Sequence, residues 1–275
     1  YFMEHPYVND LGRLYSAPAT ADELVRVYGS RHPVHPGVEV YPQIETAEPF
    51  KSNAGNQGTL VKIRRTRQVR PGVVAYRRLR DLVQGVAVPD DPLADLADAA
   101  VHIDDIAIRG AHRLFGERPV NMLTVTGEQQ PDPASRVTLD ATSRDALGMP
   151  RPHLDWRLGE DDFRSLAEGT REVALEIGRL DAARVRSSVF EAGDEWRESV
   201  TWSFHHLGTT RMGNDPSSSV VDAHCRVHGK PNLYVAGSSV FPTGGTATPT
   251  FTILALAIRI ADHIKQQMAR EAPNA

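Results

Sequence analysis

Two adjacent histidines stand in the segment Phe204-His-His-Leu-Gly-Thr-Thr-Arg-Met-Gly213. The pKa of histidine lies near neutral pH, so an imidazole can act there as a base. A catalytic base, a pair of metal ligands and ordinary surface histidines are the open interpretations. A metal site would also need His224, Cys225 or His228, and their spacing matches no zinc-finger or His-Glu-x-x-His pattern. A His-His-x-x-x-Asp acyltransferase motif is excluded because Thr210 stands where the acid is required.

A second segment with chemical potential is the small-residue loop Pro242-Thr-Gly-Gly-Thr-Ala247, which leads into an apolar helix predicted to run through Ile264. Thr248 is a residue type that caps helices, and Pro249 suits the first helical position. The helix N–H groups and its positive dipole end would then face a loop with few side chains, which can accept an anion or a planar group. A simple strand-to-helix turn is the alternative.

The elements that position these segments begin with alternating strands. Apolar and polar residues partly alternate in Val38–Ile44 and Thr59–Val69, which is typical of antiparallel strands. Apolar residues recur at helical spacing in Arg77–Gly85 and Leu93–Leu114, and the breaker segment Val86–Pro92 separates these two predicted helices.

The middle of the chain predicts a β-sheet backed by helices. Val120–Glu128 and Arg136–Leu139 are predicted strands that form a hairpin-like pair, and His153–Leu158 is a third strand. A helix is predicted from Gly159 to about Ile177 because its acidic first turn suits the helix dipole. Asn232–Ala236 is predicted to be a short buried strand.

Composition excludes several classes of protein. The 275 residues carry a formal net charge of −4, so no global field attracts DNA or an anionic membrane. The most apolar stretch, Phe251–Ile260, is about half of the ~20 residues that a membrane-spanning helix needs. Cys225 is the single cysteine, which excludes an intrachain disulfide and permits a reducing compartment. A cytoplasmic location is favoured, although a targeting signal upstream of Tyr1 would not be visible.

The alternative to an enzyme is a non-catalytic or nucleic-acid-associated subunit that uses the basic stretch from Lys62 to Arg80. Such stretches can bind phosphates. Tyr76 is the one aromatic residue within it, so base stacking has little support and a solvated strand face is the favoured interpretation.

Read together, Phe204–Gly213, Ser219–Gly229 and Asn232–Ile264 closely resemble the closing region of the glucose–methanol–choline (GMC) family of flavin-dependent alcohol oxidoreductases. Within the family they are most similar to sugar dehydrogenases and pyranose-type oxidases. The resemblance is looser upstream, where Pro131–Leu158 is similar to the substrate-domain sheet and Tyr1–Pro6 to the end of the first half of the flavin domain.

The resemblance implies an α/β (α+β) fold. We expect an antiparallel-sheet substrate domain backed by helices, together with the closing strand and helix of a Rossmann-like FAD domain. The implied divisions are residues 1–10 for the end of the first FAD-domain half, 11–203 for the substrate domain, and 204–275 for the catalytic and closing segment.

The implied reaction is oxidation of an alcohol group, on a sugar or glycoside, by a dehydrogenase or oxidase. His205 matches the family histidine that takes the hydroxyl proton while hydride passes to flavin N5. Thr248 stands where the family has asparagine or histidine, and its hydroxyl can hydrogen-bond a substrate oxygen but cannot be a base. Either His205 acts alone with Thr248 as a positioning group, or His206 compensates, or the substrate sits differently, or alcohol oxidation has been lost.

FAD is the implied cofactor, and no metal is expected. Gly237 and Ser238 match residues near the flavin, whereas Pro249, Thr250 and Phe251 match the helix start whose dipole would stabilise an anionic reduced flavin. The dinucleotide fingerprint G-x-G-x-x-G does not occur in the sequence. We therefore expect an N-terminal FAD-binding half as a partner, either a separate chain or a segment upstream of Tyr1. The electron acceptor is left open.

Overall fold

The computed structural model describes residues 1–15, 24, 26–48, 50–51, 56–66, 71–86, 88–101, 103, 120–191 and 193–271. The chain forms two compact units, a larger one of Tyr1–Ile63 with Leu123–Ala275 and a smaller one of Arg64–Met122. The predicted divisions at residues 10 and 203 stay predictions. They assign segments of this chain to parts of the family fold, whereas the two units are defined by their compactness.

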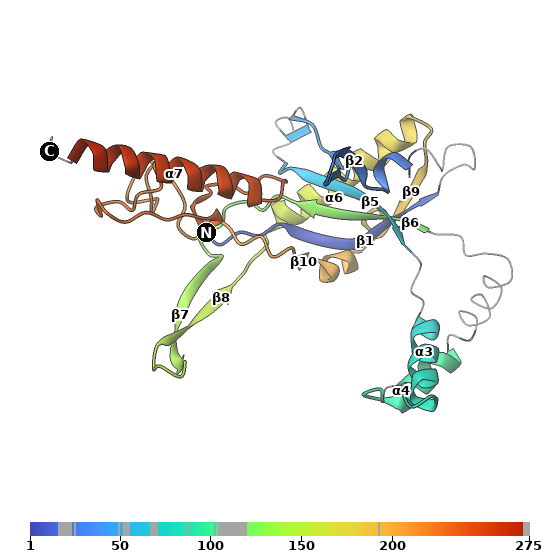
Figure 1. Cartoon of the computed structure of the whole chain (residues 1–275). Helices are drawn as coiled ribbons and strands as arrows, with labels where there is room; N and C mark the ends of the chain where they lie inside the picture. The colour runs from blue at the N-terminus through green and yellow to red at the C-terminus, as the bar shows by residue number, and fades with distance from the viewer. Residues whose placement is uncertain are drawn as a thin grey trace. The chain divides into compact units, whose positions relative to one another are not determined.

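A six-stranded sheet is the framework of the larger unit (Figure 1). Its strands follow the order β10-β1-β6-β5-β4, and β9 also pairs with β1. Both β9 and β10 run antiparallel to β1, as β4 does to β5. The sheet strands are β1 Pro6–Tyr15, β4 Ile44–Glu45, β5 Thr59–Thr66, β6 Val120–Gly127, β9 Arg184–Ser187 and β10 Thr201–Trp202.

Two hairpins lie outside this sheet, β2 His32–His35 with β3 Val38–Val40, and β7 Arg136–Arg144 with β8 Pro150–Asp155. The predicted pairing of Val120–Glu128 with Arg136–Leu139 is wrong. Strand β6 instead lies between β1 and β5, where Leu123 and Val125 are fully buried.

Helix α6, Glu160–Arg179, packs against the sheet and confirms the helix predicted from the acidic turn (Figure 1). Asp162 accepts a hydrogen bond from the backbone N–H of Gly159 at 2.8 Å, which closes the first turn. The apolar face of α6 completes the main core. Its members on strands and helix are Val8, Leu11, Leu14, Val61, Ile63, Leu123, Val125, Leu166, Val173 and Ile177.

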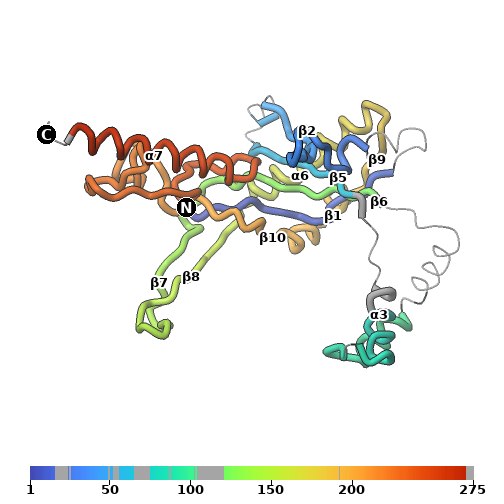
Figure 2. The backbone as a smooth tube through the Cα atoms, viewed as in Figure 1, coloured from blue at the N-terminus to red at the C-terminus, as the bar shows by residue number. Residues whose placement is uncertain are grey.

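A second core holds the C-terminal segment against the start of the chain. Met3 and Leu207 exchange two backbone hydrogen bonds, N to O, of 3.0 and 2.9 Å. Figure 2 shows the N-terminus beside the segment that precedes α7. Helix α7, Thr250–Glu271, covers this core through Ile260 and other apolar residues. The described part of the chain contains no helix long and apolar enough to cross a bilayer.

Two local predictions near the end need correction. Helix α7 begins at Thr250, and the Pro249 carbonyl accepts the N–H of Ile253 at 2.9 Å, so the cap lies at Pro249 and not at Thr248. Asn232–Ala236 is not a buried strand. It makes one isolated bridge, between Tyr234 and Arg226, and Leu233 is 50% exposed. The apolar run packs on the second core through Tyr234 and Val235 only.

The smaller unit contains α3, Pro71–Val83, and α4, Pro92–Val101, joined by the predicted breaker. The predicted continuation of α4 to Leu114 falls largely on residues 104–119, outside the described residues. Within the basic stretch, Arg78 pairs with the buried Asp95 at 3.2 Å and Arg80 pairs with Asp81. Residues 67–70 of that stretch are also outside the described residues.

Two glycines of α6 test how tightly the helix packs on the sheet. A Cβ added at Gly169 would lie 2.3 Å from Oγ1 of the buried Thr59, whereas one added at Gly178 meets nothing within 4 Å. We expect Gly169→Ala to lower the free energy of unfolding by about 1–3 kcal/mol. The matched control Gly178→Ala should raise it by about 0.5–1 kcal/mol, because alanine favours the helix. Urea denaturation measures both, and equal effects would contradict the packing.

Candidate active site

A buried carboxylate organises the loop that carries the two adjacent histidines. Glu4 is 1% exposed, and its Oε2 accepts the backbone N–H groups of His205 at 3.0 Å, Ser203 at 3.2 Å and His5 at 3.2 Å. Its Oε1 lies 2.8 Å from Nδ1 of His206. Because an ionised carboxylate only accepts hydrogen bonds, this one residue fixes the backbone on both sides of His205.

His205 forms a close pair with a second imidazole from the start of the chain. Nδ1 of His205 lies 2.8 Å from Nδ1 of His5, and the rings meet edge to face at 80° with centroids 5.0 Å apart. The hydroxyl of Ser203 lies 3.1 Å from the same nitrogen of His205. His5 is fully buried and His205 half-buried, so the pair lies at the edge of the interior.

Both imidazoles are held in their neutral form. Burial lowers the pKa of His5, although the backbone of Gly244 and Gly245 and the Glu4 carboxylate oppose the shift. Burial also lowers the pKa of His205, and the neighbouring His5 adds to the effect. A neutral imidazole retains one unprotonated nitrogen, which is the requirement for a base.

The glycine-rich loop before α7 lies against this pair. A Cβ added at Gly244 would lie 3.4 Å from Nε2 of His5 and 3.2 Å from Cδ1 of Leu207, so the backbone of the loop approaches both side chains closely. The N–H of Gly245 donates to Glu128 at 2.8 Å. The histidine segment and the loop, which the sequence identified separately, therefore meet through His5.

A second carboxylate fixes the far end of the loop. The hydroxyl of Thr246, a buried residue, donates to Glu45 at 2.6 Å, and Nζ of Lys51 donates to the same oxygen at 2.9 Å. Burial raises the pKa of Glu45, but these two hydrogen bonds outweigh burial and hold the pKa below its usual value.

The predicted cofactor residues 237 and 238 lie beside the histidine segment. The hydroxyl of Ser238 donates to the backbone carbonyl of His206 at 2.7 Å, and its own carbonyl accepts the N–H of Gly208 at 3.3 Å. Ser238 begins the short 3₁₀ helix η3, Ser238–Val240, and Gly237 precedes it with φ +140°, a conformation that favours glycine.

Thr248, Thr250 and Phe251 are exposed, while Pro249 is buried. Among the described residues, no hydrogen bond joins Thr248 to either member of the histidine pair. The roles predicted for these four residues and for His205 and His206 therefore stay predictions.

Glu4, His5 and Ser203 belong to this site but were not predicted from the sequence, whereas Gly244 lies in the loop that was. The available signal was the run Glu4-His5-Pro6, an acid next to an imidazole, in a segment to which no chemical role was assigned. Nothing local connects it with a segment that lies 200 positions later along the chain.

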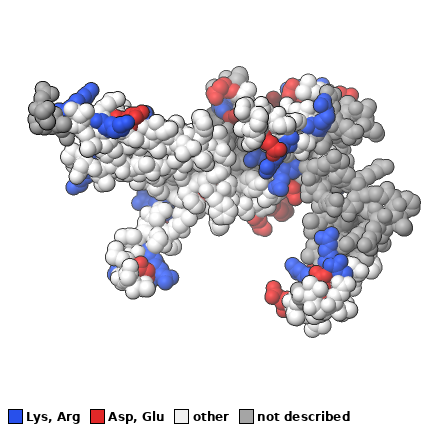
Figure 3. All heavy atoms as spheres, viewed as in Figure 1, with Lys and Arg blue, Asp and Glu red and all other residues white. Residues whose placement is uncertain are grey.

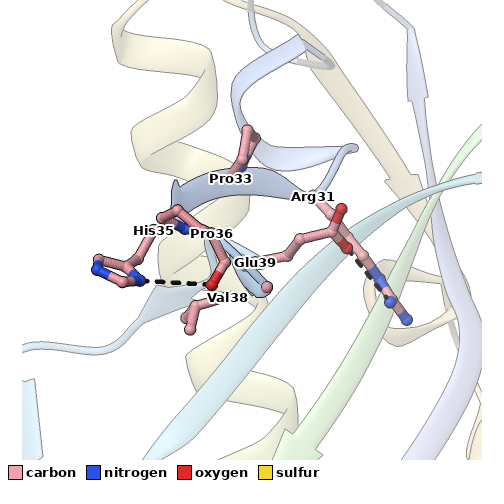
Figure 4. Close-up of a pocket in the computed structure, with 7 residues that line it drawn as sticks. Arg31, Pro33, His35, Pro36, Val38 and Glu39 are labelled. Carbon is pink, nitrogen blue, oxygen red and sulfur yellow. Dashed lines mark hydrogen bonds and ion pairs between the residues drawn. The ribbon is translucent and has the colours of Figure 1, made fainter.

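A surface pocket of about 670 Å³ lies on the β2–β3 hairpin and includes the ion pair of Arg31 with Glu39 at 3.6 Å (Figure 4). It shares no lining residue with the histidine pair or the glycine-rich loop. We therefore assign it no part in the candidate active site.

The chain is similar to one family model and to several known proteins. Residues 131–257 match the family model of the GMC oxidoreductases. The chain is 34% identical to the 2-methyl-1,2-propanediol dehydrogenase of Mycolicibacterium austroafricanum over 162 residues, which are 58% of this chain and 28% of the relative. It is 34% identical to the fructose dehydrogenase large subunit of Gluconobacter japonicus, covering 50% and 24% of the two chains.

A C-glycoside 3-oxidase of Arthrobacter globiformis is 35% identical, covering 48% of this chain and 24% of the relative. The chain thus spans about a quarter of the length of these curated relatives. Among solved structures, pyridoxine 4-oxidase from Mesorbium loti is similar with a TM-score of 0.48 and 16% identity, over 96% of this chain and 43% of that one.

The lowered pKa values of the histidine pair predict a pH-dependent stability. Unfolded histidine titrates near pH 6.5, above the folded pKa of His5 and His205, so below that pH the unfolded chain binds more protons. The contribution of the neutral pair is complete above about pH 6.5 and is lost as the pH falls toward the folded pKa. Urea denaturation from pH 8 to pH 5.5 should show this decline.

The variant His5→Asn should flatten that decline, because one of the two buried imidazoles is gone. His35→Asn, at an exposed position of β2, is the matched control and should leave it unchanged. A decline of the same size in His5→Asn and wild type would contradict the assignment.

Proposed function

The chain belongs to the GMC oxidoreductase family through its C-terminal domain, and on that premise we propose that it oxidises an alcohol group, on a sugar or glycoside, with FAD as cofactor. The observation that carries the proposal is the neutral pair of His5 and His205 against the glycine-rich loop. The names of two relatives, a fructose dehydrogenase and a C-glycoside 3-oxidase, support the sugar class. A third, a 2-methyl-1,2-propanediol dehydrogenase, supports alcohol oxidation in general.

The residues present fit a flavin. A Cβ added at Gly237 or Gly245 would meet nothing within 4 Å, so the backbone at both positions is open to a bound group. Phe251, beside the loop, is 84% exposed and has an apolar ring that a planar cofactor can cover. The residues that would hold FAD are Gly237, Ser238, Pro249, Thr250 and Phe251. When bound, FAD supplies the electron acceptor for the carbinol carbon.

His205 accepts the hydroxyl proton of the substrate in this proposal. Its Nδ1 is engaged by His5 and Ser203, which leaves Nε2 as the nitrogen that can face a substrate. The lowered pKa keeps the imidazole neutral at physiological pH, so it is ready to take up a proton. Thr248 can orient the substrate oxygen through its hydroxyl. His206 is the alternative base, and its Nδ1 lies 2.8 Å from Oε1 of Glu4.

An N-terminal FAD-binding half is the proposed partner. The chain matches the C-terminal family model and about a quarter of each relative's length. Phe251, Leu254 and Ile258 are 84%, 57% and 65% exposed, and their spacing places them on one face of α7. In Figure 3 the same half of α7 carries no charged side chains on the visible face, whereas charges gather toward its C-terminal end. We propose that the FAD-binding half covers this face.

The alternative of a nucleic-acid-associated subunit gains no support from the described residues. Two arginines of the basic stretch, Arg78 and Arg80, are already paired with aspartates. No observation favours this alternative over an oxidoreductase.

The variant His205→Gln tests the proposed base. Removing the proton acceptor should slow flavin reduction about 10²–10⁴-fold. The measurement is anaerobic bleaching of the flavin absorbance by D-fructose, D-glucose, a C-glycoside or 2-methyl-1,2-propanediol, in protein purified with every chain that accompanies it. His224→Gln, at an exposed histidine, is the control and should bleach like wild type. Unchanged bleaching in His205→Gln, or the absence of flavin in the wild-type sample, would refute the proposal.

The variant Leu254→Glu tests the partner surface on α7. A charge placed on the apolar face should weaken association with the FAD-binding half about 10–100-fold, the loss expected from exposing one leucine side chain. Intact mass and bound flavin per chain measure the association. Lys265→Glu, at an exposed polar position of the same helix, is the control and should retain the flavin. Equal flavin content in the two variants would show that this face is not the contact.

A further inference from the structure

We propose that His5 and Ser203 are positioning residues that set the tautomer of His205, keeping its proton on Nδ1 so that Nε2 presents a lone pair. The inference rests on the proposed function, in which His205 is the proton acceptor. It adds two residues to that site and gives each a separate physical role. Both residues contact the same nitrogen of His205, Nδ1.

The Ser203 hydroxyl has a single proton to donate. Oγ of Ser203 lies 3.1 Å from the backbone carbonyl of His5 and 3.4 Å from Oε2 of Glu4. Both of these oxygens can only accept, so the hydroxyl proton is directed to one of them. Toward Nδ1 of His205, 3.1 Å away, the Ser203 oxygen must then be the acceptor. That nitrogen therefore carries the proton.

The far side of the His5 ring determines which of its nitrogens carries the proton. Nε2 of His5 is buried and faces the backbone of Gly244 and Gly245, whose carbonyl groups favour a protonated nitrogen there. No described residue completes a hydrogen bond with Nε2 in full geometry, but the backbone of Gly244 and Gly245 raises the pKa of His5 against the effect of burial, the direction expected when a ring N–H faces a carbonyl group. The proton of neutral His5 is accordingly on Nε2. Its Nδ1 is then an acceptor for the Nδ1–H of His205, at 2.8 Å.

The opposite arrangement would disable the proposed base. If Nδ1 of His5 donated to His205, the neutral His205 ring would carry its proton on Nε2 and could not accept one there. In the arrangement proposed here, Nε2 takes up the substrate proton while the Nδ1–H bond to His5 is kept, so no other group has to move.

The charged and titratable groups around His5 and His205 affect how readily each ring is protonated. They do not determine which ring nitrogen carries the proton of the neutral form. Glu4 favours the protonated form of His205, whereas His5, Lys62 and His206 disfavour it. On the His5 side, Glu4 and Glu128 both favour protonation. Neither set distinguishes Nδ1 from Nε2, so the tautomer is decided by the hydrogen bonds of Ser203 and His5.

The first test is the ¹⁵N chemical shift of the imidazole nitrogens of His205, in protein labelled at histidine and purified with every accompanying chain. The signal is assigned by its loss in His205→Gln. We expect Nδ1 at the shift of a protonated nitrogen and Nε2 at the shift of an unprotonated one. The reverse pattern in the wild type would overturn the inference, whatever the activity.

The second test uses variants of the two positioning residues. Asparagine and leucine have nearly the same shape, but only asparagine places an oxygen close to the position of Nδ1. His5→Asn should therefore retain the Nδ1–H tautomer of His205, whereas His5→Leu should move part of the population to Nε2–H. Ser203→Ala should produce a shift in the same direction, and the double variant His5→Leu/Ser203→Ala a larger one.

Flavin reduction by the sugars named above provides the functional readout. We expect the His5→Leu rate at saturating substrate to fall in proportion to the lost Nδ1–H population, with the rate restored in His5→Asn. An unchanged His205 tautomer in His5→Leu would overturn the inference. If His5→Leu does not fold, the ¹⁵N chemical shifts of His205 in the wild type and in Ser203→Ala still test the inference. If the tautomer shifts as expected while His205→Gln bleaches normally, the proposed base is wrong and the hydrogen-bond assignment holds.

Discussion

The arrangement of the candidate active site depends on one buried charge, the carboxylate of Glu4. A buried carboxylate is costly unless hydrogen bonds replace its hydration, and here one oxygen accepts three backbone N–H groups while the other contacts His206. The same bonds that stabilise the charge shape the loop at Ser203–His206. The His205 ring is therefore oriented by the backbone on which it stands, as well as by contacts made to the ring itself.

Much of the fold could be predicted from local pattern. The acidic turn at Gly159 specified where α6 begins, because capping and the dipole act over a few residues. The partner of β6 could not be predicted in this way. Alternation identifies a strand but not its neighbours, and the strand next along the chain, β7, pairs with β8 instead. The prediction of a buried strand at 232–236 was wrong for a similar reason. An apolar sequence does not show whether another segment buries its side chains, and Leu233 is 50% exposed.

The site was predictable only in part. His205 and the glycine-rich loop have recognisable local sequences, and the structure brings the two segments together around His5. His5, Glu4 and Ser203 act through hydrogen bonds to residues distant in sequence or to backbone groups, which leave no periodic signature. The close approach at Gly244 likewise becomes meaningful only when the neighbouring ring is known. Local pattern thus located the proposed base, while the residues that hold it in place could be found only from the fold.

The pairing of Met3 with Leu207 has a consequence for biosynthesis. Residues at the start of the described chain contact partners that are synthesised about two hundred positions later. Contacts of such long sequence separation form slowly. Glu4 and His5 therefore lack these partners until the segment that contains Ser203 and His205 has been synthesised. The pair of imidazoles cannot form before that point.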